Sequence, residues 1–301
     1  MSGVSPAVTM RPSILSKQVY GYLLLLPALV FLVAFTHYPV IATFWQSLLA
    51  GHGGSPAKFA GLQNYQSIMQ DPVFIQSVKN TLFYALITIP LSCGLALLMA
   101  LAVNRPCKGR GLLRSAFFLP SLLPMIAIAN LWLFFYSPQT GVLNHWLNSL
   151  GFSSINWLGD PHVSLYSLMA VTVWREAGFF MIFYLAALQQ QDAKLYEAAR
   201  VEGASASHFF WKVQWPLLMP TTIFILINAT LNAFRLADVI IAMTNGGPDN
   251  STTLLLFYIY QTAFSYWDTA SASAMTIVLL VMLATLAWLK FYFLDKKTWY
   301  Q

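Results

Sequence analysis

Long apolar runs separated by short polar segments make up most of the chain. Four of these runs contain no Asp, Glu, Lys or Arg and cover residues 19–37, 81–104, 116–136 and 270–289. Two more, residues 165–191 and 217–244, are as long and hold two charged residues each. A helix needs about 20 mostly apolar residues in sequence to cross a bilayer, whereas membrane-barrel strands alternate apolar and polar residues. The pattern therefore predicts an all-α membrane protein with six transmembrane helices.

Two segments between the apolar runs are long, residues 38–80 and 137–164. In the second, one helical stripe of apolar side chains predicts a helix lying flat at the membrane interface: Val142, Leu143, Trp146, Leu147 and Leu150. Residues 254–267 are apolar and aromatic but number only 14, so we expect an interfacial or re-entrant helix rather than a seventh span. Each proline at positions 27, 90, 120 and 124 removes a backbone hydrogen bond, which predicts kinks in the first three spans.

The N-terminal residues carry Arg11 and Lys17 ahead of the first apolar run. A cleaved secretion signal has the same charge pattern, but its apolar part is shorter and ends at a small-residue cleavage site. The run at 19–37 is too long for a signal, and no A-x-A site follows it. We therefore expect an uncleaved first span that follows a tail of residues 1–18.

The composition favours one membrane-embedded body over one or two soluble domains. Of 301 residues, 58% are hydrophobic and only 9% are charged, whereas a soluble domain carries about 25% charged residues. These values also exclude collagen-like, disordered and disulfide-scaffold proteins. Cys93 lies in an apolar run and Cys107 in a basic loop, so neither a structural disulfide nor a zinc site is expected.

The net charge of +6 is explained by membrane topology. With the N-terminus inside, twelve of the 16 Lys and Arg residues fall in inner segments: Arg11, Lys17, Arg105, Lys108, Arg110, Arg114, Lys194, Arg200, Lys212, Lys290, Lys296 and Lys297. The outer segments hold Lys58 and Lys79, and the spans hold Arg175 and Arg235. This asymmetry predicts an N-in, C-in protein. Nucleic-acid binding is not expected, because the basic cluster at 105–114 is a short turn between two spans.

The inner loop between the fourth and fifth spans is the longest inner segment. Residues 193–202 are good helix formers, Gly203 breaks that helix, residues 205–213 can form a second short helix, and Pro216 is expected to end it. A solvated connector would fit these propensities. A loop of this length in a compact domain is more often functional, which favours a cytoplasmic protrusion.

This loop carries a resemblance to a known family. Glu197, Ala198 and Ala199, followed by Gly203 and Pro216, resemble the EAA loop of ABC importer permeases, whose pattern is E-A-A, three residues, G, nine residues and I-x-L-P. Val213 and Trp215 stand where that pattern has isoleucine and leucine, and both remain apolar. The resemblance implies that the loop, residues 192–220, is a pair of coupling helices that docks on a separate ATPase subunit.

Other segments resemble the carbohydrate branch of that family, which includes permeases for maltose-type oligosaccharides and for glycerol-3-phosphate. They are GLQNYQSIM at 61–69, Asn80-Thr81, LYEAARVEGA at 195–204 and TNGGPDNSTTLLLFYIYQTAF at 244–264. The resemblance covers about residues 19–297 and implies a multi-pass protein of the bacterial inner membrane, in contact with membrane lipid. Its implied partners are a second homologous permease, two ABC ATPase subunits and an extracytoplasmic solute-binding protein.

No motif predicts an enzyme. The sequence holds no G-x-x-x-x-G-K-[ST] phosphate loop, no H-E-x-x-H and no G-x-S-x-G, and its five histidines are scattered. We expect no catalytic residue, metal or cofactor in this chain, with ATP and Mg bound by the partner ATPase.

Charged and polar residues within the spans are the candidates for a translocation path, because such groups at membrane depth face a cavity or a partner. The fourth span holds Trp174, Arg175 and Glu176, of which the last two are adjacent and need partners elsewhere. Packing against the partner permease is the alternative for these residues. Glu176 beside Arg175 also offsets any preference for a phosphate, so a carbohydrate or related polyol is the expected solute.

The fifth span adds Asn228, Asn232, Arg235 and Asp238. Arg235 and Asp238 are three residues apart, which on one helix predicts a structural ion pair. The two asparagines extend the polar face of the path or form hydrogen bonds between spans.

The predicted organisation is a tail of residues 1–18, a six-helix permease domain of residues 19–294 with its coupling loop at 192–220, and a C-terminal tail of residues 295–301. A second hypothesis is a self-sufficient secondary transporter or channel driven by an ion gradient through Arg175, Glu176 and Asp238. Inverted repeats would favour that hypothesis, and none is visible in the sequence.

Overall fold

The computed structural model describes residues 14–50, 58–105 and 108–294. The C-terminal tail and most of the N-terminal tail lie outside the described residues, as do Arg11, Cys107, Lys296 and Lys297. The helices in chain order are α1 (Ile14–Leu32), η1 (Val33–His37), α2 (Tyr38–Ser47), α3 (Gln63–Gln70), α4 (Pro72–Asn104), α5 (Arg110–Leu122), α6 (Met125–Phe135), α7 (Val142–Ser149), α8 (Ser164–Gln189), α9 (Ala193–Val201), α10 (Ala206–Phe209), η2 (Phe210–Gln214), α11 (Trp215–Phe234), α12 (Asp238–Met243), α13 (Leu255–Phe264) and α14 (Thr269–Leu294). β1 (Leu49–Ala50) and β2 (Lys58–Phe59) pair antiparallel.

Within the described residues, five helical segments are long and apolar enough to cross a membrane, or six if the bent pair α5 and α6 forms one span. The span predicted over 116–136 is formed by two helices, α5 and α6, that meet at 103°. Pro124 stands at the break with extended backbone, and it cannot donate the hydrogen bond that would continue α5. The predicted kink in this region is confirmed as a sharp bend.

The fifth predicted span, 217–244, ends ten residues earlier than expected. α11 ends at Phe234, and a separate short helix, α12, begins at Asp238. Asp238 lies in the first turn of α12, where its Oδ1 accepts a hydrogen bond from the Val239 N–H at 3.0 Å. A carboxylate is favourable at the positive end of a helix dipole, so Asp238 begins a helix rather than continuing one.

α4 begins nine residues before the predicted start at residue 81. Asp71 caps it by accepting the Val73 N–H at 2.9 Å, and Pro72 occupies the first helical position, where its missing N–H costs nothing. The fourth and last predicted spans are close to the observed α8 and α14. Short helices α7 and α13 form where the sequence predicted interfacial ones.

Two π-turns allow helices to pass through prolines. η1 and η2 each end two residues before a proline, Pro39 and Pro216. In η2 the Trp215 N–H bonds to the Phe210 carbonyl oxygen, five residues back. This wider turn displaces the carbonyl that a proline ring would otherwise meet. The prediction that Pro216 ends the second loop helix is therefore wrong, and the helical path from Ala206 runs through to Phe234.

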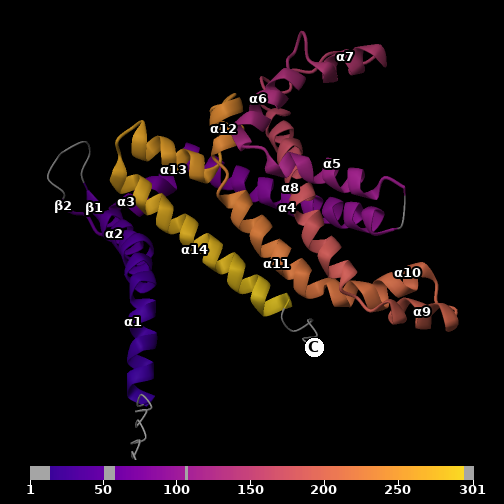
Figure 1. Cartoon of the computed structure of the whole chain (residues 1–301). Helices are drawn as coiled ribbons and strands as arrows, with labels where there is room; N and C mark the ends of the chain where they lie inside the picture. The colour runs from indigo at the N-terminus through magenta and orange to yellow at the C-terminus, as the bar shows by residue number, and fades with distance from the viewer. Residues whose placement is uncertain (1–13, 51–57, 106–107, 295–301) are drawn as a thin grey trace, which may run out of the picture.

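The body of the molecule is built on α4 and α8, which pack along each other and are covered by α11 and α5 (Figure 1). Buried Tyr84 on α4 donates a hydrogen bond to Thr172 on α8 at 2.6 Å. On the other side of α8, a Cβ at Gly178 would lie 2.0 Å from the Phe117 carbonyl oxygen of α5. Only glycine permits this approach, so the sequence of α8 fixes its distance from α5.

Asn80 and Thr81 hold the loop that precedes α13. The Asn80 side-chain amide donates to the backbone oxygens of Asn250, Ser251 and Thr253, at 2.9, 3.1 and 3.0 Å. Thr81 Oγ1 accepts from the Leu255 N–H at 2.8 Å. Two segments singled out in the sequence, Asn80-Thr81 and 244–264, thus meet in space.

α1 lies apart from this body. It extends as a single helix away from α4, α8 and α11 (Figure 1), and it continues through η1 into α2, which packs on α14. The described candidate span Gly21–Ser47 has none of its most hydrophobic window buried within the chain. The first span is therefore longer than the predicted 19–37 and contributes little to the core.

Candidate functional site

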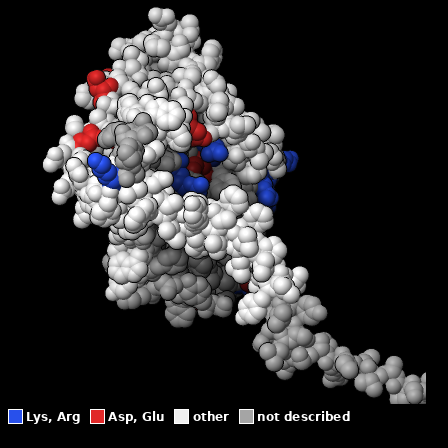
Figure 2. Space-filling model, turned by 90° about the vertical axis from the view of Figure 1, so that its left-hand side faces the viewer, with Lys and Arg blue, Asp and Glu red and all other residues white. Residues whose placement is uncertain are grey.

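A polar cavity of about 460 Å³ lies between α5, α8, α11 and the start of α12. Nine residues line it: Ser121, Arg175, Glu176, Phe179, Asn228, Asn232, Arg235, Leu236 and Asp238. In the face shown in Figure 2, acidic and basic side chains adjoin one another in a hollow amid mostly uncharged residues. Six of the seven residues predicted for a translocation path are thus brought together in one cavity.

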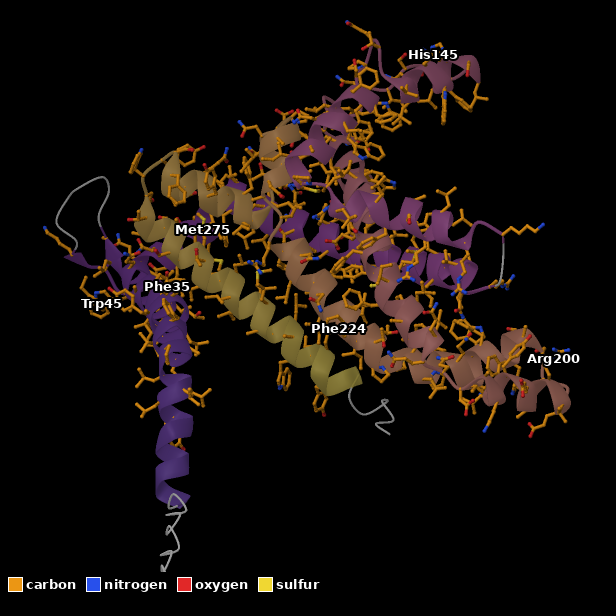
Figure 3. The ribbon with its side chains drawn as sticks, viewed as in Figure 1. Phe35, Trp45, His145, Arg200, Phe224 and Met275 are labelled. Carbon is orange, nitrogen blue, oxygen red and sulfur yellow. The ribbon has the colours of Figure 1, made fainter. Side chains whose placement is uncertain are left out.

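Glu176 is partnered by the neighbouring helix. Its side chain is buried, with 8% of its surface exposed, and its Oε1 accepts a hydrogen bond from Asn232 Nδ2 at 2.9 Å. The expectation that Glu176 needs a partner elsewhere is confirmed, and Asn232 both lines the cavity and links two helices. Asn228, one turn earlier, donates to the Phe224 carbonyl oxygen of its own helix at 2.8 Å. Figure 3 labels Phe224 on α11.

The predicted ion pair between Arg235 and Asp238 does not form. The helix ends at Phe234, and Arg235 has φ −101° and ψ 9°, so the two residues do not share a helical face. Across the described part of the chain, no salt bridge joins Arg175 or Arg235 to a carboxylate. Both guanidinium groups face the cavity without an ion-pair partner.

Trp174 lies on a different cavity. This second space, of about 490 Å³, lies among α5, α6, α7 and α8 and is lined by apolar and aromatic side chains. Trp174 meets Trp132 there edge to face, with ring centroids 5.6 Å apart. The sequence could not separate Trp174 from its neighbour Arg175, because adjacent helical residues point about 100° apart and either direction can be apolar.

Three lining residues were not anticipated: Ser121, Phe179 and Leu236. Phe179 is three residues after Glu176 on α8, so helical spacing alone could have indicated it. Ser121 lies beside Pro120 in an apolar run, a weak signal of an interrupted helix. Leu236 has no sequence signal, because it reaches the cavity only through the turn after α11.

The loop between α8 and α11 has a complete helix stop at Gly203. The Gly203 N–H bonds to the Arg200 oxygen at 3.1 Å, and the Ala204 N–H to the Ala199 oxygen at 2.9 Å. Together with φ of +73° at Gly203, these are the two hydrogen bonds of a Schellman motif. Open space surrounds the position of a Cβ at Gly203, so the backbone conformation is what requires glycine. The predicted helix–glycine–helix is confirmed.

Side chains then close the two short helices against each other. Tyr196 on α9 and Phe209 on α10 meet edge to face at 5.5 Å, and Ser205 Oγ caps α10 by accepting the His208 N–H at 3.2 Å. At the base of the loop, Gln214 Nε2 donates to Gln191 Oε1 at 3.2 Å. The result is an ordered protrusion.

The outer surface of this protrusion is exposed. Val201 is 89% exposed, and Glu197 and Ala198 are also exposed. Arg200 is at the far end of the loop from the helical body (Figure 3). Leu195 and Tyr196 are exposed on the same short helix, and several exposed apolar side chains on one ordered element are typical of a docking site.

Lys290 was expected in an inner segment, but its side chain packs against α11. Its Nζ, counted among the inner charges in the sequence, donates to the Leu226 oxygen of α11 at 2.9 Å and contacts Thr230 Oγ1. It lines a mostly apolar groove of about 380 Å³ between α4, α11 and α14. The described residues contain no group of His, Cys, Asp or Glu that could hold a metal ion.

Comparison with known proteins identifies the family. Residues 92–299 match the family of binding-protein-dependent transport system inner membrane components. The chain belongs to this family. It is therefore a multi-pass inner membrane protein, and the matched region begins within α4 and includes α5 to α14.

Three permease proteins of other organisms align with this chain over nearly their whole length. The sn-glycerol-3-phosphate permease protein UgpA of Agrobacterium fabrum is 31% identical over 97% of this chain and 100% of its own. The trehalose/maltose permease protein MalF of Thermococcus litoralis is 36% identical over 90% of this chain and 92% of its own. The lactose permease protein LacF of Rhizobium radiobacter is 34% identical, over 95% and 98%.

Solved structures share the fold. A chain of a bacterial alginate ABC transporter, in complex with a periplasmic protein that carries an alginate pentasaccharide, aligns with a TM-score of 0.82. It is 24% identical and covers 92% of this chain and 94% of its own. A second structure, of a transporter involved in import of the acidic polysaccharide alginate, gives a TM-score of 0.80 at 25% identity, covering 94% and 97%.

Proposed function

We propose that this chain is one permease subunit of an ATP-driven ABC importer and forms half of the path for a carbohydrate or related polyol. The observation that carries the proposal is that the polar cavity and the exposed loop are built on the same two helices. α8 carries Arg175 and Glu176 and leads into α9. α10 leads through η2 into α11, which carries Asn228 and Asn232.

In this arrangement, α8 and α11 connect the loop to the cavity, so a movement of the loop would be transmitted along them. At 1.5 Å of rise per residue, Glu176 lies about 20 Å from the end of α8, and Asn232 lies about 25 Å from the start of α11. Because Asn232 bonds to Glu176 across the two helices, a tilt of either helix moves the same wall of the cavity. Docking motions at the loop would thus open one side of the path and close the other.

The loop is the proposed coupling site, with both termini and the loop on the cytoplasmic side. Glu197 and Ala198 are exposed on α9, Ala199 beside them is half-buried, Gly203 sets the turn, and Pro216 lies where the loop enters α11. A groove on a partner ATPase would receive this protrusion. The chain would then be a transport subunit without enzymatic activity, and the ATPase would bind ATP and Mg.

The solute class and the remaining partners rest on the relatives and on one unpartnered helix. Relatives named for sn-glycerol-3-phosphate, trehalose/maltose and lactose support a carbohydrate or polyol. A related transporter is complexed with a periplasmic protein, which supports a solute-binding protein as partner. The exposed apolar α1 supports a second permease, since none of the most hydrophobic window of its span is buried by the described part of the chain.

The test is ATP-driven uptake into vesicles that hold the whole importer, with a variant at the coupling turn. Gly203→Val places a β-branched side chain at φ +73°, a conformation that such residues adopt only with strain. We expect uptake to fall at least about tenfold and the ATPase subunits to be lost during purification.

Gly151→Val is the matched control, because Gly151 also has positive φ, +86°, with open space around it, and lies after α7, far along the chain from the loop. It should keep both uptake and the ATPases. If wild-type vesicles take up solute without ATP or the partner subunits, the chain is a secondary transporter or channel and the proposal is wrong.

A further inference from the structure

The polar cavity holds two guanidinium groups and two carboxylates, so its formal charges balance. The carboxylates and the guanidinium groups differ, however, in whether they have hydrogen-bond partners. Glu176 accepts from Asn232, and Asp238 accepts from the Val239 N–H at the start of α12. Neither carboxylate is bonded to Arg175 or Arg235 through a salt bridge in the described structure. Each carboxylate thus accepts a hydrogen bond, whereas neither guanidinium group has a hydrogen-bond or salt-bridge partner among the described residues.

Arg175 is the sharper case, because part of its guanidinium is buried. Its Nε atom is shielded from solvent and has no hydrogen-bond partner. Arginine cannot lose its proton in a protein, so it stays charged and keeps this N–H as a donor. A buried donor without an acceptor is uncommon in native structures and costs more when it belongs to a charged group. Arg175 also lines the cavity, so its other guanidinium nitrogens are the donors that an acceptor in the cavity can reach.

We propose that the solute carried through this cavity has an anionic group, a carboxylate, phosphate, sulfate or sulfonate, that binds Arg175 and Arg235. The inference rests on the proposed function of the cavity as a solute path. Arginine binds such groups through two parallel N–H···O bonds, which give both orientation and strength. Asn228 and Ser121 also line the cavity, where their remaining hydrogen-bonding capacity can serve hydroxyl groups of the solute.

A neutral polyol fits the same cavity less well. Its hydroxyl groups can accept from Arg175, but they bring only dipoles to two full positive charges. Charged groups at membrane depth are stabilised chiefly by a counter-charge or by water. An anionic group supplies that counter-charge, and Asp238, the exposed carboxylate on the cavity, would oppose it. Arginine and Asp238 variants are therefore expected to act in opposite directions.

The experiment measures uptake by the complete importer, with its binding protein outside and ATP inside proteoliposomes. The probes are matched pairs: glucuronate and glucose 6-phosphate against glucose, and glycerol 3-phosphate against glycerol. We expect the wild type to take up at least one anionic probe. Arg175→Gln and Arg235→Gln should each raise the KM for that probe about tenfold, the loss expected for one charge-assisted contact. Asp238→Asn should lower the same KM. Arg114→Gln, an exposed position on α5 outside the cavity, is the control.

The outcomes separate this inference from the function on which it rests. ATP-driven uptake confined to glucose or glycerol, or uptake of none of the anionic probes, would overturn the inference. So would an anionic probe whose KM is unchanged in the Arg175→Gln and Arg235→Gln double variant. Arg175→Lys, which keeps the charge, should restore part of the affinity, and equal loss in Arg175→Lys and Arg175→Gln would indicate a packing role instead. Uptake without ATP would overturn the proposed function itself.

Discussion

Asn232 is the residue on which the buried Glu176 depends. It supplies the hydrogen bond to Glu176 Oε1, and it comes from a different helix. Polar residues within an apolar helix normally find such a partner or face a cavity. Here one side chain does both.

Asn232→Ala should therefore destabilise the protein more than Asn228→Ala. The first change leaves Glu176 buried without its donor, which costs about 1–3 kcal/mol. The second removes a bond only to the carbonyl oxygen of Phe224 in its own helix. Thermal unfolding of the detergent-solubilised importer measures the difference. Equal unfolding temperatures for the two variants would show that the bond between α8 and α11 contributes little.

Sequence patterns predicted most of the residues that line the cavity, and the residues that were not predicted correctly have physical explanations. Arg175, Glu176, Asn228 and Asn232 stand out because polar groups are costly in an apolar run. Trp174 does not follow the same rule, since an aromatic ring is as well placed against Trp132 as against a solute. The separation of Arg235 from Asp238 could not be predicted, because it depends on where α11 ends.

At the scale of helices, the approach of α5 to α8 is set by Gly178. A Cβ there would lie 2.0 Å from a backbone oxygen, and backbone cannot move aside as a flexible side chain can. Ser121 on α5 and Glu176 on α8 both line the cavity, so the separation of these helices also sets its width.

Gly178→Ala should force the two helices apart and destabilise the protein by about 1–3 kcal/mol, the usual cost of overpacking. Gly94→Ala is the matched control, since it also lies within a long helix, α4, and has open space at its Cβ position. Alanine there is expected to be neutral or to stabilise by up to about 1 kcal/mol. Unfolding temperatures of both variants test the contrast, and a neutral Gly178→Ala would mean that α5 can yield.

Helix boundaries were predictable where a cap or a long apolar run marks them, as at both ends of α8. Helix boundaries were not predicted correctly where they depend on a local backbone conformation rather than on side-chain type. Pro216 reads as a stop signal, yet the π-turn before it lets the helix continue. Residues 217–244 read as one span, yet the chain turns at Arg235. Hydropathy alone does not record a π-turn or a short break.

At the scale of the molecule, α1 is an apolar helix whose side chains stay exposed in the part of the chain that the structure describes. Tyr22 is 70% exposed, Leu24 82% and Phe31 64%. The sequence predicted that this segment crosses the membrane but could not show that it lies apart from the body, because apolar residues are equally suited to lipid and to protein.

A helix that binds a second permease along one side should reveal that side by its period. We expect alanine substitutions at successive positions from Tyr22 to Leu32 to weaken co-purification of the partner permease with a repeat of about 3.6 residues. Positions that face lipid should tolerate the change, because shortening a lipid-facing side chain opens no cavity in packed protein. Unfolding of the body should stay constant through the series, since this helix contributes little to its core. A flat profile would mean that α1 faces lipid on all sides and that the second permease is held elsewhere.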